Sequence, residues 1–226
     1  MKKNLQKTVF SEQIREQLME DILNGRLQPG EKLSEIALAN EFNVSQAPVR
    51  EALKSLEVLG LVTSEPYKGT IVRTSSEQAM KEYFQVRSAL EGLAGRLAAE
   101  NATDEEIRVM EKLVTDMMEA AGKGEKELRT ELNRDFHNAL IDSSHNGMLI
   151  SVCRSLRLGS WSKITAKYTR MSDKDITERH TEIIDYLKAH DADGAENALQ
   201  EHVHQSFEMF THGAAVIAAE ETGQNA

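Results

Sequence analysis

The stretch that decides the fold is NVSQAPVREALKSLEVLG, from Asn43 to Gly60. Ser45 is placed to cap a helix, because a serine hydroxyl can accept a hydrogen bond from a free backbone N–H one turn on. Pro48 then falls in the first turn, where a missing N–H costs little. Gly60 can adopt the left-handed conformation that commonly ends a helix. The stretch therefore predicts a helix that begins after Ser45 and ends before Gly60.

The two faces of this helix differ. Apolar side chains recur at helical spacing on one face, at Val49, Leu53 and Leu56. The opposite face carries hydrogen-bonding side chains, at Gln46, Arg50 and Lys54. A polar face is usually only a solvated face, but glutamine can pair with adenine, and arginine with guanine or a phosphate. The helix is therefore a candidate for insertion into a DNA groove.

The segments on either side favour that interpretation. Residues 34–42 predict a short capped helix, and residues 42–44 leave only a tight connection between the two helices. Residues 61–64 and 70–73 alternate like strands around a turn at 65–69. Helix, tight turn, helix and hairpin in this order predict a winged helix-turn-helix.

Upstream, apolar residues recur every four positions from Phe10 to Ile22, which predicts a first helix that ends near Gly25. Residues 1–9 are expected to form a loose basic arm, and residues 26–33 a turn. The winged helix-turn-helix then occupies residues 1–75.

From Ser76 onward the hydrophobic pattern is helical throughout, and no further strand is expected. Thr103 and Glu106 have the spacing of a capping box, and the glycines at 122 and 124 should break the helix that follows. The predicted helices span residues 76–99, 103–121, 125–142, about 147–168, 172 to about 190, and about 195–220. We therefore expect a mostly α protein, with an all-helical bundle over residues 76–226.

Composition limits the class of protein. The net charge of −10 lies entirely after residue 75, because the first 75 residues hold 10 Lys/Arg and 10 Asp/Glu. An acidic second domain does not prevent the first from binding DNA. No apolar run is long enough to span a membrane, and Cys153 is the only cysteine. A single cysteine excludes an internal disulfide and suits the cytoplasm.

The N-terminal quarter resembles the GntR family of bacterial transcription regulators. The residues that carry this resemblance are GRLQPGEKL from Gly25 to Leu33, VSQAPVREALKSL from Val44 to Leu56, Gly60-Leu61-Val62, and the wing Lys68-Gly69-Thr70. The remainder resembles the FCD effector domain of the FadR subfamily, through RSALEGLA from Arg87 to Ala94, NRDFHNAL from Asn133 to Leu140, His180 and His202.

The resemblance implies a homodimer that binds a palindromic, double-stranded DNA operator. It implies DNA contacts from the recognition helix and the wing, by Ser45, Gln46, Ala47, Arg50, Lys68 and Gly69. Family members usually carry Arg at the position of Gln46 and Thr at that of Ala47. Glutamine shifts the expected readout from guanine towards adenine and removes a charge. Gly69 lacks a Cβ, so its backbone can approach DNA closely.

The resemblance also implies a metal site. Asn133 and His137 lie one turn apart on one helix face, and His180 precedes the apolar residues of its own helix. By periodicity alone such histidines are more often core residues. The resemblance makes Asn133, His137, His180 and His202 the ligands of a divalent metal, with Zn²⁺ expected and Ni²⁺ or Mn²⁺ as alternatives. Many relatives have Asp at the position of Asn133, and a neutral amide weakens the site.

A small organic acid is the expected effector. In the family an arginine at the position of Arg87, or one from the helix of Arg157, often faces the effector pocket, and a guanidinium can hold a carboxylate bidentately. The alternative for Arg87 is an ion pair with Glu91, one turn on. The remaining histidines are expected at the surface: His145, His190, His204 and His212.

The function expected from the sequence is ligand-controlled transcriptional regulation without enzymatic activity, most simply repression. Two alternatives belong to other classes. One is a metal-dependent hydrolase with an appended DNA-binding module, which needs a general base beside a metal-bound water. The other is a constitutive DNA-binding protein whose helical domain only dimerises.

Overall fold

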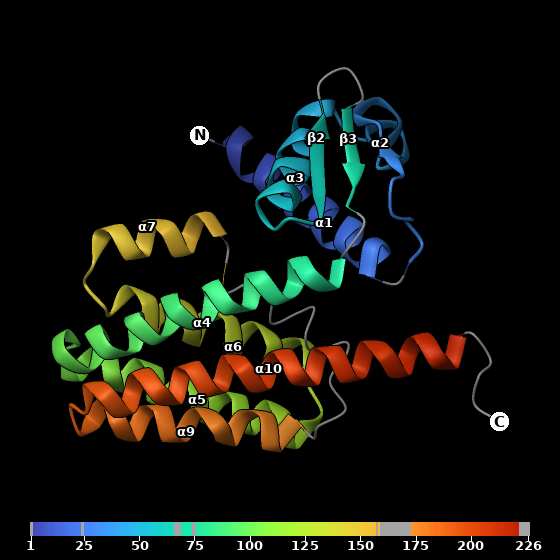
Figure 1. Cartoon of the computed structure of the whole chain (residues 1–226). Helices are drawn as coiled ribbons and strands as arrows, with labels where there is room; N and C mark the ends of the chain where they lie inside the picture. Colours follow the sequence, from blue (N-terminus) through green and yellow to red (C-terminus); the bar gives the residue numbers. More distant parts are fainter. Residues whose placement is uncertain are drawn as a thin grey trace. The chain divides into compact units, whose positions relative to one another are not determined.

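The computed structural model of the chain describes residues 2–23, 25–65, 69–73, 76–156, 158 and 173–221. The chain divides into two compact units, residues 1–83 and 84–226. Figure 1 shows helices around a short sheet in the first unit, and long helices packed side by side in the second. Helix α4 (Ser76–Asn101) crosses the division. Ala79, Met80 and Tyr83 in its first turns are buried and belong to the first unit.

The first unit has the predicted winged helix-turn-helix architecture. Its elements are α1 (Lys2–Leu23), β1 (Lys32–Leu33), α2 (Glu35–Glu41), α3 (Gln46–Val58), β2 (Val62–Glu65) and β3 (Gly69–Val72). Strand β3 lies between β1 and β2 and is antiparallel to both. The register pairs Val62 with Val72 and Glu65 with Gly69, which forms the hairpin of the wing.

Two predictions for this unit were wrong. Residues 2–9 belong to helix α1 rather than to a loose arm. Lys32 and Leu33, predicted within a turn, form strand β1 through pairing with Ile71 and Thr70. A strand of two residues is too short to show a periodic pattern, so its existence depends on the distant strand that it joins.

Helix α3 is held in place by α1, against which it packs. Leu18 and Met19 of α1 are buried together with Val49 and Leu56 of α3. Each fully buried side chain of this size contributes roughly 1.5–3 kcal/mol through removal of its apolar surface from water. The apolar face predicted for residues 43–60 is therefore the face that fixes the helix to the unit, and its other face stays at the surface.

The second unit is a bundle of helices. It contains most of α4 (Ser76–Asn101), and α5 (Asp104–Lys123), α6 (Lys126–Asp142), α7 (Gly147–Leu156), α9 (Asp173–Lys188) and α10 (Ala192–Glu221). Helix α5 packs against α6 and α9, and α9 packs against α10; α5, α9 and α10 run alongside one another in Figure 1.

The ends of the helices differ in detail from the prediction. The capping box of Thr103 and Glu106 is formed, but α5 continues through Gly122 and ends at Gly124, which is left-handed at φ 73°. Helix α10 begins at Ala192, earlier than predicted, because the Asp191 carboxylate accepts from the backbone N–H of Gly194. Helix α7 ends at Leu156. The predicted continuation to Tyr168 and the predicted cap at Ser172 lie outside the described residues.

Candidate DNA-reading helix and metal centre

Helix α3 begins as predicted at Ser45, but without the predicted cap. Ser45 has extended backbone at the N-cap position, and its side chain makes no capping hydrogen bond. The Ser34 hydroxyl does cap α2, where it accepts from the backbone N–H of Ala37. The hydroxyl of Ser45 instead lies at the exposed end of α3, where it can hydrogen-bond to a molecule outside the unit.

The polar face of α3 is open to solvent. The sequence-predicted DNA contacts at its start are all exposed, and they are Ser45, Gln46, Ala47 and Arg50. Lys54, one turn beyond Arg50, keeps 65% of its side-chain surface exposed. Since Val49 and Leu56 on the other side are completely buried, the helix presents its hydrogen-bonding groups outward as a single row.

Arg50 is held by a carboxylate that the sequence did not indicate. Its Nε and Nη2 atoms donate to the two carboxylate oxygens of Glu35 in α2, at 2.8–3.1 Å. The hydrogen bond from Arg50 lowers the pKa of Glu35, so the pair is charged at neutral pH. This fork-to-fork contact joins the two helices of the helix-turn-helix and fixes the guanidinium at the surface.

The wing contributes Gly69, which is exposed at the start of β3. Its φ of 84° lies in the left-handed region that other residues avoid. The glycine is therefore required by the backbone of the hairpin. Lys68, the other predicted wing contact, lies outside the described residues.

Three histidines from three helices meet in the core of the second unit. They are His137 in α6, His180 in α9 and His202 in α10. Each offers one ring nitrogen within 4.8 Å of the nitrogens offered by the others, and at most 6% of each residue is exposed. The ring centroids are 4.6–5.6 Å apart. We call these three residues the histidine cluster.

The rings of the cluster are prepared to offer lone pairs. His180 Nδ1 lies 3.2 Å from the backbone oxygen of Thr177, to which it can donate. Burial, together with the nearby His180 and His137, holds the pKa of His202 well below its usual value, so this ring is neutral. Within the described part of the chain, His137 Nε2 and His202 Nδ1 are buried and have no hydrogen-bond partner. Buried polar atoms of this kind require an explanation.

Glu91, a residue of α4, lies against the cluster. Its Oε2 is 2.8 Å from His137 Nδ1, a short distance that is not aligned as an ideal hydrogen bond. Its Oε1 accepts from Arg87 Nε at 2.6 Å, so the ion pair considered for Arg87 is present. Burial would raise the pKa of Glu91, but its contacts with Arg87 and His137 outweigh burial and hold this pKa at about 2.

The donor set of the cluster suits a divalent metal. Neutral imidazole nitrogens are ligands of Zn²⁺, Ni²⁺ and related ions, and metal binding requires that they be deprotonated. No carboxylate or thiol of the described residues joins the three histidines as a further ligand. The residues present therefore fit three positions of a site, and further positions would be filled by an amide, a water or a ligand.

The chain matches two family models. Residues 10–72 match the bacterial regulatory proteins of the gntR family, and residues 82–205 match the FCD domain. The protein belongs to the GntR family, with an FCD domain. The resemblance identified from the motifs is thereby confirmed, and both families consist of transcription regulators rather than enzymes.

Similar proteins extend the match over most of this GntR regulator. It is 34% identical over 203 residues to the "Probable D-xylose utilization operon transcriptional repressor" of Paenarthrobacter nicotinovorans, covering 89% of this chain and 88% of that protein. It is 30% identical to the Nta operon transcriptional regulator of Aminobacter aminovorans, over 80% and 85% of the two chains. The solved structure of McbR/YncC from E. coli is similar at 25% identity and a TM-score of 0.63, over 89% and 97% of the chains.

Two other predicted site residues are Asn133 and Arg157. Asn133 is half-buried on α6, one turn before His137, so both share a helix face. Arg157 lies outside the described residues. No helix among the described residues is long and apolar enough to cross a membrane.

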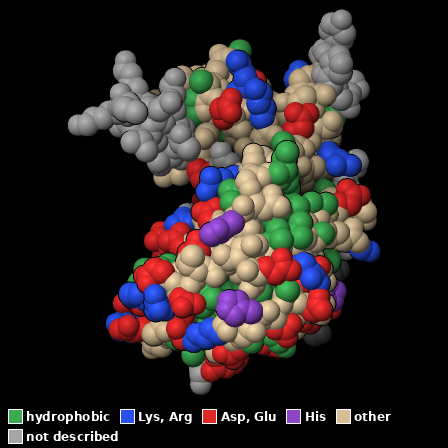
Figure 2. Space-filling model, turned by 90° about the vertical axis from the view of Figure 1, so that its left-hand side faces the viewer, with side chains coloured by type: hydrophobic (Ala, Val, Ile, Leu, Met, Phe, Trp, Pro, Cys, Tyr) green, Lys and Arg blue, Asp and Glu red, His purple; other side chains and the backbone are tan. Residues whose placement is uncertain are grey.

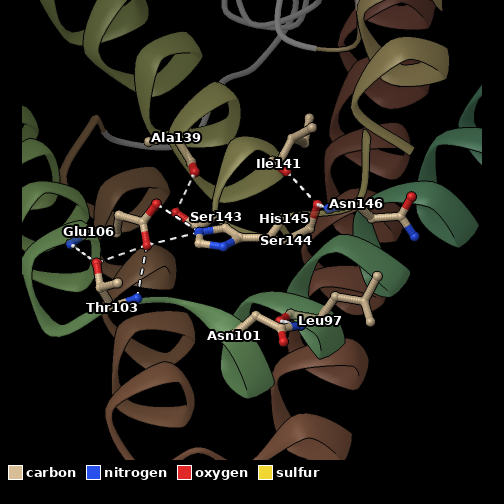
Figure 3. A network of polar contacts seen from close by, with 10 residues as sticks. All are labelled: Leu97, Asn101, Thr103, Glu106, Ala139, Ile141, Ser143, Ser144, His145 and Asn146. Carbon is tan, nitrogen blue, oxygen red and sulfur yellow. Dashed lines mark hydrogen bonds and ion pairs between the residues drawn. The ribbon is translucent and has the colours of Figure 1, made fainter. Parts of the chain in front are cut away.

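The four remaining histidines are exposed, as predicted, and histidine side chains are visible among mixed acidic and basic groups on the face in Figure 2. His145 lies at φ 52° in the turn between α6 and α7. Its Nε2 contacts the Glu106 carboxylate at 2.9 Å, and Glu106 also accepts from Thr103 (Figure 3). This histidine thus ties the turn to the start of α5.

Proposed function

We propose that the protein is a repressor that binds a palindromic operator as a homodimer and responds to a small carboxylate bound at a metal. The observation that carries the proposal is the histidine cluster, with ligand nitrogens within 4.8 Å of one another and a buried carboxylate behind one ring. The cluster lies in the FCD part of a chain that also presents an exposed reading helix. Repression is supported by the relative from Paenarthrobacter nicotinovorans that is named a repressor.

The operator is read by helix α3 and the wing. We assign Gln46 and Arg50 to base or phosphate contacts, because both are exposed on its polar face. Ser45, Ala47, Lys68 and Gly69 complete the interface. Gln46 favours adenine, whereas arginine at that position would favour guanine. We therefore expect an operator whose half-sites differ from those of relatives that carry arginine there. We expect the regulator in the cytoplasm, where a bacterial operator would lie.

Two copies are needed to read a palindrome. Helix α4 offers a surface for a second copy, because Val86, Ala89 and Leu93 are spaced i, i+3 and i+7 and are exposed. Half of Val86 and 39% of Leu93 remain accessible to solvent. Burial of this apolar stripe against its equivalent in another copy would give the symmetric contact of a twofold dimer.

The metal, most simply Zn²⁺ with Ni²⁺ or Mn²⁺ as alternatives, would be held by His137, His180 and His202, with Asn133 as the oxygen ligand. When bound, it supplies a positive centre to which an effector carboxylate can attach. Arg157 would grip the same carboxylate, whereas Arg87, for which this role was also expected, is held by Glu91. An effector that prefers one dimer geometry shifts the spacing of the recognition helices and thereby operator affinity.

The experiment is an operator-binding assay on the full chain, after selection of the operator from random DNA. We compare three samples: metal-free protein in chelator, protein with Zn²⁺, and protein with Zn²⁺ plus each of a series of small organic acids. Each acid is also added to the metal-free protein. We expect one acid to lower operator affinity only when Zn²⁺ is present. Operator binding that no acid alters would contradict control by a carboxylate effector, and an acid effect that persists in chelator would contradict the role of the metal.

Arg50→Ala tests the assigned helix in the same assay. We expect operator binding to fall at least tenfold, the lower range for the loss of a bidentate base contact, while the dimer remains intact. Arg108→Ala is the matched control, because Arg108 is another exposed arginine paired with a glutamate but lies in the FCD unit. Equal binding by both variants would show that α3 does not read the operator.

A further inference from the structure

Glu91 is a buried charge beside the histidine cluster to which the proposed function gives no role of its own. It comes from α4, whereas the three histidines come from α6, α9 and α10. None of its surface is exposed. A carboxylate leaves water at a large cost unless charged or donating groups replace the water, so the groups that Glu91 contacts account for its position.

The contact with His137 fixes where the hydrogen of this ring lies. Carboxylate Oε2 and ring Nδ1 are 2.8 Å apart. Two acceptors at this distance would repel each other, so Nδ1 must carry a hydrogen. A neutral imidazole has one N–H, and the lone pair is therefore on Nε2. Within the described part of the chain both ring nitrogens of His137 are buried without an aligned hydrogen bond, but Nδ1 has the Glu91 carboxylate beside it, which leaves Nε2 as the atom that can present a lone pair.

Arg87 fixes the carboxylate in turn. Its Nε donates to the other oxygen of Glu91 at 2.6 Å, from one turn earlier on the same helix. Both side chains are almost completely inaccessible to solvent, so neither can rotate into water. Arg87, Glu91 and His137 form a chain in which each group orients the next.

We propose that Glu91 is a positioning residue for the histidine cluster, which holds His137 in the tautomer that presents Nε2 to a divalent metal, with Arg87 holding Glu91. The proposal rests on the metal site of the proposed function. Carboxylates behind a histidine ligand act in this way in metal sites, where they fix the ring and raise its basicity.

The charge of Glu91 has a second consequence. All four proposed ligands are neutral, since an amide stands at Asn133 where a carboxylate would offset part of the metal's charge. Glu91 brings a negative charge to within one imidazole ring of the metal position. Arg87 offsets part of this charge through its contact with the other oxygen of Glu91, and the part that remains stabilises a divalent ion that the carboxylate does not itself touch.

Glu91→Gln tests the proposal, because it removes the charge and keeps the shape. Glu106→Gln is the matched control, since Glu106 contacts His145 at 2.9 Å away from the cluster. Two measurements are made on each full-length protein. Nitrogen NMR of the metal-free protein, prepared with a chelator and measured at mildly alkaline pH, reports the tautomer of His137. Competition with a chromophoric chelator reports the Zn²⁺ affinity.

We expect the wild type to hold His137 with the hydrogen on Nδ1, and Glu91→Gln to lose this preference. Zn²⁺ affinity should fall about 10–100-fold in Glu91→Gln and stay unchanged in Glu106→Gln. Unchanged tautomer and unchanged affinity in Glu91→Gln would overturn the proposal and leave Glu91 with a structural role only.

Two further arms keep the outcomes distinct. Arg87→Met/Glu91→Gln removes both buried charges, so it supplies a folded comparison if Glu91→Gln alone does not fold, and it should show the same loss of tautomer and affinity. If the wild type binds no Zn²⁺, the metal part of the proposed function fails. The tautomer of His137 then still tests whether Glu91 positions this ring. A ring with its hydrogen on Nε2 would contradict that role.

Discussion

The buried pair of Arg87 and Glu91 allows a quantitative test of the FCD unit. Glu91 is completely buried and Arg87 is 3% exposed, with Nε and Oε1 2.6 Å apart. Three variants separate the charges: Glu91→Gln, Arg87→Met and the double variant. Each single variant leaves a charged partner in the core, whereas the double variant leaves none.

The pKa of Glu91 gives the size of the effect. A value of about 2, against 4.5 for an ordinary glutamate, corresponds to about 3 kcal/mol in favour of the ionised carboxylate. Removal of one partner from a buried pair typically costs about 3–5 kcal/mol, whereas replacement of both by neutral groups of similar size is often close to neutral. We therefore expect each single variant to lose about 3 kcal/mol in free energy of unfolding, and the double variant to lose about 1 kcal/mol.

Urea unfolding followed by far-ultraviolet circular dichroism measures these free energies. A chelator is present throughout, so that metal binding does not add to the stability of the folded state. Glu105→Gln serves as the control, because Glu105 pairs with Arg108 at the surface and should leave the midpoint almost unchanged. The reasoning is refuted if Glu91→Gln unfolds at the midpoint of the control, or if the double variant is no more stable than Glu91→Gln.

Four further outcomes are expected. Gln46→Arg should change the preferred operator base towards guanine, and selection that returns the wild-type operator would show that Gln46 reads no base. Asn133→Asp should tighten Zn²⁺ binding roughly tenfold, an effect of about 1.4 kcal/mol, whereas calorimetry with no change would remove residue 133 from the ligand set. Burial raises the pKa of the Cys153 thiol from 9.0 to about 11, so at pH 8 it should react with a disulfide reagent about a hundredfold more slowly in the folded than in the unfolded chain; equal rates would contradict its burial. Hydrogen bonds from Thr103 and His145 lower the pKa of Glu106, so its contribution to stability is present above the unfolded pKa and lost as pH falls through the folded one. In Glu106→Gln the melting temperature should therefore fall slightly less steeply as the pH is lowered. An identical fall in the wild type and the variant would count against a stabilising contact of Glu106 with Thr103 and His145.

The ends of the helices show how much of the structure a local sequence pattern can predict. The cap of Ser34, the capping box of Thr103 and Glu106, and the left-handed Gly60 follow rules that involve only residues three or four positions apart, and all three are present. The same local reasoning was wrong for the side chain of Ser45, whose hydroxyl is not used as a cap. Where a local rule fails at an exposed position on α3, the side chain remains available to another molecule.

The candidate metal site was likewise predicted only in part from the sequence. Periodicity on its own favoured ordinary core histidines, and the resemblance to FCD domains was needed to select His137, His180 and His202. Their convergence depends on the packing of α6, α9 and α10. Glu91 was considered only as a partner for Arg87, because nothing in the sequence connects it with His137, 46 positions further along the chain.

The sequence by itself determined the winged helix-turn-helix, the helical second domain, the apolar and polar faces of α3 and the family. These properties depend on hydrophobic period, caps and turn residues, which act between near neighbours. Only the tertiary structure decided that Glu35 holds Arg50, that β1 pairs with β3, and that Arg87, Glu91 and His137 form one buried chain. Each of these contacts joins segments whose separation is fixed by the packing of whole elements, and a local pattern contains no information on which distant side chain will fill a given place.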